Sequence, residues 1–379
     1  MKKGTWYRRM VIPVVAVLGI AVAACGSSGS GGGDSATSSA ASQVQASLPK
    51  PITSPPASVG ITTPMNAAPQ KSKTFFWLQC ELPICGKITQ GVKAATTAAG
   101  WKYENLVFKA NDPGAGLQSA LQRKPDAIGI TGIPSAAVKA QLAAAAKAGI
   151  PVVTCSAGPE EPGPTTYSAI CSHTTGPDGK NMALWAIRDS GGKANMVSVT
   201  IPSFPSLAAT VNGTADAAKA NCPKCTTDVL NLTVDDLAGG QVASKLIAYL
   251  QSHPKVNYVL FTFADLENGV PEALKAAGLA DKVTIVGNGA GEAQFKAVAG
   301  GAHQAWVAYP AVLEGWQMVD AAIRLVGGGK LPSNYQTQLE HLPTYIVDTP
   351  SAAKQLAPSY DWSGPAGYAE QFKKLWKIG

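Results

Sequence analysis

Residues 256–290 read VNYVLFTFADLENGVPEALKAAGLADKVTIVGNGA, and this stretch decides the fold class. A short apolar run lies at each end, and the segment between them has a turn and helical spacing that stop at Gly278. Continuous apolar runs are typical of buried parallel strands, and this connection is too long for a hairpin but long enough for a helix. The stretch therefore predicts a strand–helix–strand unit in a parallel sheet.

Side chains suited to ligand binding stand at the carboxyl ends of both predicted strands. Phe263, Ala264 and Asp265 end the first strand, and Asn288 and Gly289 end the second. In open α/β sheets, ligands bind at these carboxyl ends. We therefore expect Phe263, Asp265 and Asn288 to contact a ligand.

The same alternation of strand and helix continues on both sides of this unit. It forms two successive series of about equal length, which is typical of doubly wound parallel sheets. The expected fold class is therefore α/β, with two Rossmann-like lobes. A helix predicted at 182–187 begins the second series, and another is predicted at 292–299. The other predicted strands lie at 74–79, 103–108, 127–131, 151–155, 167–171, 194–200, 228–232 and 304–308.

These series set the expected domain limits. The expected limits are 73–173 plus 310–340 for the first lobe, 174–309 plus 341–349 for the second lobe, and 350–379 for a C-terminal tail. In the tail, Phe372 and Trp376 share a helical face, so we expect the tail to dock on a lobe.

The N-terminus has the features of an export signal. Basic residues occupy its first positions, residues 10–23 are apolar, and small residues lead to Cys25. This pattern resembles a bacterial lipoprotein signal, 1–24, which implies cleavage before Cys25 and lipidation of its thiol. An ordinary signal peptide or a short membrane anchor is the alternative. Residues 25–72 are rich in Gly, Ser, Ala and Pro, a composition that predicts a flexible, disordered tether.

The cysteines fit an oxidising compartment. Apart from Cys25 there are six, and they form three pairs that are close in sequence. We expect the disulfides Cys80–Cys85, Cys155–Cys171 and Cys222–Cys225. The alternative for Cys222–Cys225 is a zinc knuckle or a redox-active pair, but no second pair has knuckle spacing.

Other function classes lack support in the sequence. The net charge is +7, but four of the basic residues lie in the first ten positions, and no basic-aromatic run indicates a nucleic-acid partner. The four histidines are scattered, and the glycines of 287–291 do not have the spacing of a dinucleotide fingerprint. We therefore expect no catalysis, no metal and no cofactor.

Four segments carry a resemblance to a known family. They are KITQGVKAATTAAGW (87–101), PDAIGITGIPSAAVKAQLAAAAKAGIPVVT (125–154), HPKVNYVLFTFAD (253–265) and DKVTIVGNGAG (281–291). The chain resembles type I periplasmic binding proteins, in particular the ribose- and galactose-binding branch that serves ABC importers. The resemblance implies a three-segment hinge, closure around one small molecule, and delivery of that molecule to ABC permease subunits.

The lipoprotein-like N-terminus implies a location, and the family resemblance implies a set of cleft residues. The protein would be a monomer, held outside the cytoplasm on the outer face of the cell membrane by lipidated Cys25. A ligand-sensing lipoprotein that signals to a membrane receptor is the alternative. The expected ligand contacts are Gln79, Glu81, Leu82, Ser156, His173, Phe204, Thr210, Phe263, Asp265, Asn288 and Tyr309.

Several of these positions depart from the family pattern. Ser156 stands where the family often has Asp, Thr210 where Arg is common, and Tyr309 where Gln is frequent. A site with fewer charged partners satisfies fewer hydroxyl groups. The expected ligand is a small neutral molecule. The resemblance implies a sugar or sugar-like ligand, and these departures favour one that is less polar or aromatic. Trp77 is expected with the other aromatic residues near the rim of the cleft.

Overall fold

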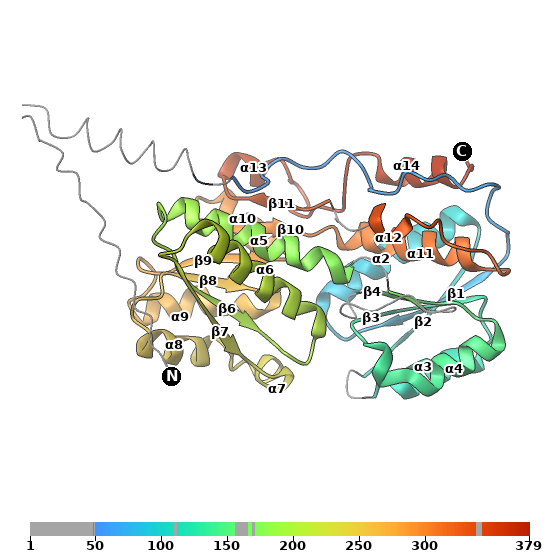
Figure 1. Cartoon of the computed structure of the whole chain (residues 1–379), viewed down its shortest axis with the longest axis horizontal. Helices are drawn as coiled ribbons and strands as arrows, with labels where there is room; N and C mark the ends of the chain where they lie inside the picture. Colours follow the sequence, from blue (N-terminus) through green and yellow to red (C-terminus); the bar gives the residue numbers. More distant parts are fainter. Residues whose placement is uncertain (1–47, 49, 110–111, 156–165, 169–170, 339–342) are drawn as a thin grey trace, which may run out of the picture. The chain divides into compact units, whose positions relative to one another are not determined.

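The computed structural model describes residues 48, 50–109, 112–155, 166–168, 171–338 and 343–379 (Figure 1). For residues 166–168, 171–175, 336 and 337 only the backbone is described. The strands form two sheets. The first has the order β2-β1-β3-β4-β5 and the second has the order β11-β10-β9-β8-β6-β7. The prediction of an α/β fold with two lobes is confirmed.

Every pairing in the first sheet is parallel. Its strands are β1 (Thr74–Gln79), β2 (Lys102–Val107), β3 (Ala127–Thr131), β4 (Val152–Cys155) and β5 (Thr166–Ser168). The second sheet is parallel except for its edge strand β11, which runs antiparallel to β10. Its strands are β6 (Asn195–Thr200), β7 (Thr226–Asn231), β8 (Tyr258–Phe261), β9 (Thr284–Asn288), β10 (Gln304–Ala308) and β11 (Tyr345–Val347).

Helices connect and cover these strands. Those of the first lobe are α2 (Pro83–Ala99), α3 (Pro113–Gln122), α4 (Lys139–Ala148), α11 (Ala311–Leu325), α12 (Tyr335–Gln338) and the 3₁₀ turn η1 (Ser135–Val138). Those of the second lobe are α5 (Cys171–Asp189), α6 (Pro205–Asn221), α7 (Val234–Ala238), α8 (Val242–Ser252), η2 (Ala264–Glu267), α9 (Val270–Ala276), α10 (Glu292–Ala299) and α13 (Pro350–Lys354). A last helix, α14 (Tyr368–Leu375), ends the chain. In the described part of the chain, no helix is long and apolar enough to cross a membrane.

The first lobe depends on a close crossing of α2 and α11. A Cβ atom on Gly91 would lie 1.9 Å from the carbonyl oxygen of Val312, and one on Gly315 would lie 2.5 Å from that of Ile88. No side chain fits at these distances, so two glycines allow the helix backbones to touch. This crossing fixes α11 against β3 and β4 of the first sheet.

The chain passes between the two sheets three times. The passages lie between β5 and α5, between β10 and α11, and between α12 and β11. Helix α5 begins at Cys171, whereas the sequence predicted a helix only over 182–187. The reason is its extensive packing along α6, which stabilises a helical turn that contains Pro177.

The structure differs from the predicted tether in residues 50–72. Val59 and Ile61 are buried in the core of the first lobe, with exposed fractions of 1% and 3%. The backbone amide of Ile346 in β11 donates to the carbonyl oxygen of Ile52, 2.7 Å away. Two buried apolar side chains and several hydrogen bonds dock this segment on cores and partners that other elements form.

The end of the chain packs on the first lobe. Phe372 and Trp376 are fully buried, and the Trp376 ring stacks on Trp316 of α11 at a centroid distance of 5.4 Å. The indole nitrogen of Trp376 donates to Asp320 at 2.6 Å. Asp320 is fully buried and also accepts from Arg324 at 2.8 Å and from Tyr335 at 2.6 Å. Such a set of donors satisfies a buried carboxylate.

Candidate functional site

Three neighbouring strands of the second sheet end in polar side chains that are buried or half-buried. Thr200 ends β6, Asp265 follows β8 in η2, and Asn288 ends β9. In each, one side-chain oxygen is buried without a hydrogen-bond partner among the described residues: Oγ1 of Thr200, Oδ2 of Asp265 and Oδ1 of Asn288. Leaving a buried polar group unpaired costs about 1–3 kcal/mol. Atoms of this kind at one sheet edge are suited to receive hydrogen bonds from a ligand.

Two features of its surroundings act on the pKa of Asp265. Burial raises the pKa of this carboxyl group, and the positive charge of Lys87 lowers it. Lys87 belongs to α2 of the first lobe, and its Nζ lies 3.5 Å from the position that a Cβ on Gly291 would take. The first lobe therefore places a cation next to the polar edge of the second lobe.

A buried triad lies beneath Asn288. Its Nδ2 donates to Oδ2 of Asp178 at 3.2 Å, and Oγ1 of Thr344 donates to Oδ1 of Asp178 at 2.6 Å. Asp178 is fully buried, and burial raises its pKa to about 7. Asp178 belongs to α5, while Thr344 precedes β11, so the triad joins elements that follow two of the three passages between the sheets. Neither Asp178 nor Thr344 was predicted from the sequence.

A second buried carboxyl group lies at the passage from β10 to α11. Tyr309 follows β10 and donates to Oε2 of Glu314 in α11 at 2.7 Å. The other oxygen of Glu314 contacts Sγ of Cys155 at the end of β4. Burial raises the pKa of Glu314 to about 7. Tyr309 is thus oriented by a partner that the sequence analysis missed, because an acid in an apolar helical stripe gave no local signal.

Aromatic side chains line one part of the second lobe. The half-buried rings of Phe204 and Phe263 meet edge to face, with centroids 6.4 Å apart. The prediction that Trp77 lies at the rim is wrong. Trp77 is fully buried in the first core, and its indole nitrogen donates to Thr89 at 2.8 Å.

The expected contacts of the first lobe follow β1. Gln79 ends this strand, and its Oε1 accepts from Oγ1 of Thr89 at 2.8 Å. Glu81 is exposed, and Leu82 directly precedes α2. The disulfide Cys80–Cys85, with Cα atoms 5.7 Å apart, closes this short loop. The disulfide therefore ties the first turn of α2 to the end of β1.

Of the remaining expected contacts, Thr210 is buried inside the second lobe, and Ser156 and the side chain of His173 are not described by the structure. Thr210 is fully buried in α6, at the point where its carbonyl group touches Gly179 of α5. Within the described part of the chain, its Oγ1 has no hydrogen-bond partner. Ser156 lies outside the described residues, and so does the side chain of His173.

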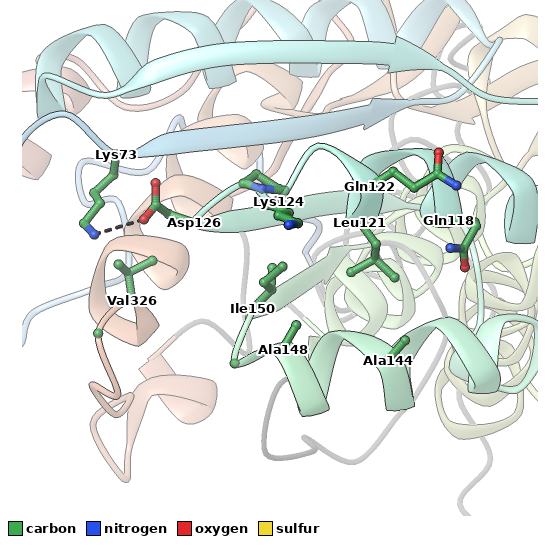
Figure 2. Close-up of a pocket in the computed structure, with 13 residues that line it drawn as sticks. Lys73, Gln118, Leu121, Gln122, Lys124, Asp126, Ala144, Ala148, Ile150 and Val326 are labelled. Atoms are coloured by element: carbon green, nitrogen blue, oxygen red, sulfur yellow. Dashed lines mark hydrogen bonds and ion pairs between the residues drawn. The ribbon is translucent and has the colours of Figure 1, made fainter.

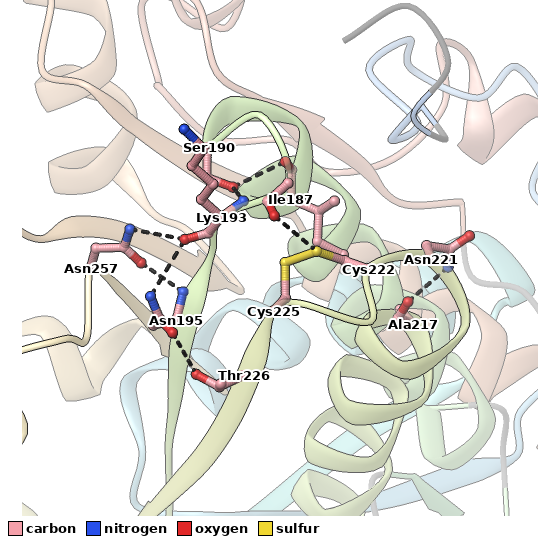
Figure 3. Close-up of a disulfide and its surroundings, with 11 residues drawn as sticks. Ile187, Ser190, Lys193, Asn195, Ala217, Asn221, Cys222, Cys225, Thr226 and Asn257 are labelled. Atoms are coloured by element: carbon pink, nitrogen blue, oxygen red, sulfur yellow. Dashed lines mark hydrogen bonds between the residues drawn. A yellow bond between two sulfur atoms is a disulfide. The ribbon is translucent and has the colours of Figure 1, made fainter. Parts of the chain in front are cut away.

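Two of the three expected disulfides are present. Figure 3 shows Cys222–Cys225 between the end of α6 and the start of β7, with Cα atoms 5.3 Å apart. Cys222 is 5% exposed, and its Sγ lies 3.3 Å from the carbonyl oxygen of Gly192. This burial favours a structural role over a redox-active one. The pair Cys155–Cys171 includes a side chain outside the described part. Among the described residues, no group of three His, Cys, Asp or Glu side chains could hold a metal.

A hollow of about 490 Å³ lies at the end of the first sheet that is opposite to the carboxyl ends of its strands. Figure 2 shows Lys73 and Asp126 on one side of it, joined by an ion pair of 2.9 Å, and Ala144 and Ala148 of α4 on the other. Lys73 and Asp126 directly precede β1 and β3, so the hollow lies at the amino ends of the strands. Ligands of such sheets bind at the carboxyl ends, and the hollow is therefore not the candidate site.

Comparison with known proteins identifies the family. Residues 68–330 match the family described as "Periplasmic binding protein domain". Comparison with curated protein sequences found no match. One solved structure with a similar fold is an ABC transporter solute binding protein from Agrobacterium vitis with bound allitol (TM-score 0.62, 19% identity, 75% of this chain and 98% of that chain).

Two further structures have similar folds. One is a periplasmic ribose ABC transporter protein from Conexibacter woesei (TM-score 0.62, 17% identity, 78% of this chain and 98% of that chain). The other is a 5-methylthioribose transporter solute binding protein from Thermotoga lettingae (TM-score 0.63, 16% identity, 83% of this chain and 99% of that chain). At these identities the similarity shows a shared fold and not a shared ligand. The family match covers more than half of the chain, which therefore belongs to the type I periplasmic binding proteins.

Proposed function

We propose that this protein captures a small, neutral, hydroxyl-bearing molecule between its lobes and delivers it to the permease of an ABC importer. The family is one of solute-binding proteins that catalyse no reaction. The observation that carries the ligand class is the pair of buried acceptors, Oδ2 of Asp265 and Oδ1 of Asn288, which lie at neighbouring strand ends and have no partner among the described residues. Two acceptors require two donors, and hydroxyl groups on a compact ligand supply them.

The aromatic pair beside these acceptors narrows the ligand further. Phe204 and Phe263 offer apolar surface next to Asp265. A sugar or polyol has hydroxyl groups at its edges and C–H groups on its faces, so it satisfies both features. A purely aromatic ligand would leave Asp265 and Asn288 without donors. The similar structures whose names include allitol, ribose and 5-methylthioribose support the same class.

Capture requires a ligand that binds the closed arrangement of the lobes better than the open one. Lys87 of the first lobe lies near the acidic edge of the second, so a bound ligand would bridge groups from both lobes. No bond is made or broken in this process. The closed form would then be the state that the permease recognises.

The proposed location is outside the cytoplasm, at the outer face of the cell membrane. Disulfides Cys80–Cys85 and Cys222–Cys225 are suited to an oxidising compartment. A lipid on Cys25 would hold the chain at the outer face of the cell membrane. Mass spectrometry of the exported protein should show a lipidated Cys25 at the N-terminus. A mature chain that retains residues 1–24, or that begins after Cys25, would contradict the lipid anchor.

Calorimetry with a defined ligand panel tests the ligand class. We expect a pentose or polyol, from a panel of ribose, allitol, 5-methylthioribose, galactose and aromatic acids, to bind the purified protein. D265A should weaken that binding by roughly 10- to 100-fold, the effect of losing a buried acceptor. D281A, at an exposed aspartate of the same lobe, is the matched control and should bind as the wild type does. Binding of aromatic acids alone, or full affinity in D265A, would overturn the assignment.

A further inference from the structure

Two segments outside the part that matches the family contact both lobes. We name residues 50–65 the arm and residues 350–378 the tail. Both lie beyond residues 68–330. Figure 1 shows the arm in blue and the tail in red along the same side of the protein. They differ from the three passages in their position in the chain, because the arm precedes β1 and the tail follows β11.

The arm is held by both lobes. At its beginning, the amide of Ile52 donates to Oδ1 of Asn181 in α5 at 2.7 Å, and its carbonyl oxygen accepts from Ile346 in β11. At its end, Val59 lies in the core of the first lobe, and Arg324 of α11 donates to the carbonyl oxygen of Thr63 at 2.9 Å. The stretch between these anchors contains two consecutive prolines at 55–56, which restrict the backbone. The arm is therefore a short, stiff link.

The tail changes from one lobe to the other within a few residues. Trp362 is buried in the core of the second lobe, where its ring meets Tyr345 of β11 at 5.0 Å. Two residues later, a Cβ on Gly364 would lie 3.2 Å from Leu313 of α11, in the first lobe. Asp361 forms an ion pair of 2.5 Å with Lys87 of α2. Since two extended residues span roughly 7 Å at most, this crossing has little slack.

The arm and the tail also bind each other. The side chain of Gln371 in α14 accepts from the amide of Val59 at 3.2 Å and donates to the carbonyl oxygen of Ala57 at 3.1 Å. The amide of Met65 donates to the carbonyl oxygen of Leu375 at 2.8 Å. The two segments therefore form one connected structure that is anchored on both lobes.

We propose that the arm and the tail form a clasp that limits how far the two lobes open. The proposal deepens the hinge closure of the proposed function, but it concerns the protein without ligand. Lobes that separate at the cleft move Leu313 and Lys87 away from Trp362 and Asp361. Because the tail has little slack, the lobes can separate only slightly before Trp362 is pulled out of the second core or Trp376 out of the first. The unliganded protein therefore samples a narrower range of openings than the three passages alone would permit.

Cutting the clasp after folding tests this proposal. A protease site inserted between Thr53 and Ser54, and another between Ala366 and Gly367, allow the arm and the tail to be cut in the folded protein. All four residues are exposed. The first site lies between Ile52, which is bonded to the second lobe, and Val59 in the first core. The second lies between Trp362 in the second core and Trp376 in the first, so after this cut only the contacts of Asp361 and Gly364 still hold the preceding residues on the first lobe.

Spin labels on exposed residues of each lobe report the distance between the lobes. Suitable positions are Gln118 of α3 and Gln251 of α8, both of which are exposed. Labelling through a non-natural amino acid leaves the disulfides intact. The expected result is a mean distance longer by several ångström and a broader distribution after both cuts.

A control cut, a point variant and a measurement of folding separate the clasp from general damage to the protein. A cut between Gly239 and Gly240, exposed within the second lobe, should change neither the mean distance nor its distribution. Q371A, which loses both bonds to the arm, should broaden the distribution without any cut. Circular dichroism before and after cleavage shows whether the lobes stay folded. Folded protein with an unchanged distance distribution after both cuts would overturn the clasp, whether or not a ligand is ever found.

Discussion

Lys87 and Asp361 form an ion pair of 2.5 Å between helix α2 and the C-terminal tail. The two residues are separated by 274 positions, and both side chains are partly buried. The same lysine lowers the pKa of Asp265, which burial raises. One cation thus interacts both with the tail and with the candidate ligand site.

The first prediction concerns this shared lysine. In K87Q the pKa of Asp265 should rise, because burial remains and the favourable charge is lost. In D361N it should fall, because Lys87 no longer has a competing carboxylate. Carbon-13 NMR titration of the aspartate carboxyl groups measures both shifts. Equal pKa values of Asp265 in wild type and K87Q would show that the two groups do not interact.

The second prediction concerns Asp178 and pH. Burial raises its pKa from 3.8 to about 7, so within that window the folded protein binds more protons than the unfolded chain. The free energy of unfolding contributed by this group therefore falls as pH rises through the window. The side chain that D178N introduces carries no charge, so it lacks this pH dependence. The stability of D178N relative to wild type should grow with pH, by no more than about 4 kcal/mol.

Urea unfolding between pH 4 and 8.5 measures that difference. Subtracting wild type from D178N removes the similar contribution of Glu314, whose pKa burial also raises to about 7. D281N, at an exposed aspartate, is the control and should show no such trend. A difference that is constant across the range would mean that the pKa of Asp178 is the same in the folded and unfolded states and that burial does not raise it.

The third prediction compares two glycines of α2. G91A should destabilise the protein by at least about 1–3 kcal/mol, because its Cβ would lie 1.9 Å from the carbonyl oxygen of Val312. At Gly86 nothing in the described part of the chain lies within 4 Å of an added Cβ, so G86A should be neutral or stabilising by up to about 1 kcal/mol. Thermal unfolding of both variants provides the comparison. Similar melting temperatures would contradict the close crossing of α2 and α11.

The fourth prediction concerns the disulfide Cys222–Cys225. The double variant C222S/C225S should lose about 2 kcal/mol of stability, since the bond closes a loop with a sequence separation of only 3. Alkylation of the denatured, unreduced wild type should leave both cysteines unmodified, and reduction should expose them. Ready alkylation in the folded protein without reductant would instead favour the redox-active alternative.

The regular elements were largely predictable. The predicted helix at 292–299 and strand at 304–308 have the bounds of α10 and β10, because their apolar spacing and flanking glycines agree. Helix α5 was underestimated, because Gly176 and Pro177 indicate a turn locally while packing on α6 imposes a helix. Short elements such as α12 and β11 were missed, because they are too brief to show a period.

The candidate site was predictable only where it follows strand ends. Asp265 and Asn288 were placed together because neighbouring parallel strands end at one edge. Their partners were not predictable. Asn288 meets Asp178 across 110 positions, and Asp178 meets Thr344 across 166. A polar residue in the sequence shows that a partner is needed and does not show which distant residue supplies it.

By itself, the sequence determined the two series of strands and helices and the edge at which polar side chains gather. Periodicity reports which face of a local element is buried, and this information is sufficient for a sheet and its ends. Only the tertiary structure decided that residues 50–65 join a core despite their proline-rich composition, and that Lys87 pairs with Asp361. These contacts depend on cores and charges that distant segments create, and no local pattern records them.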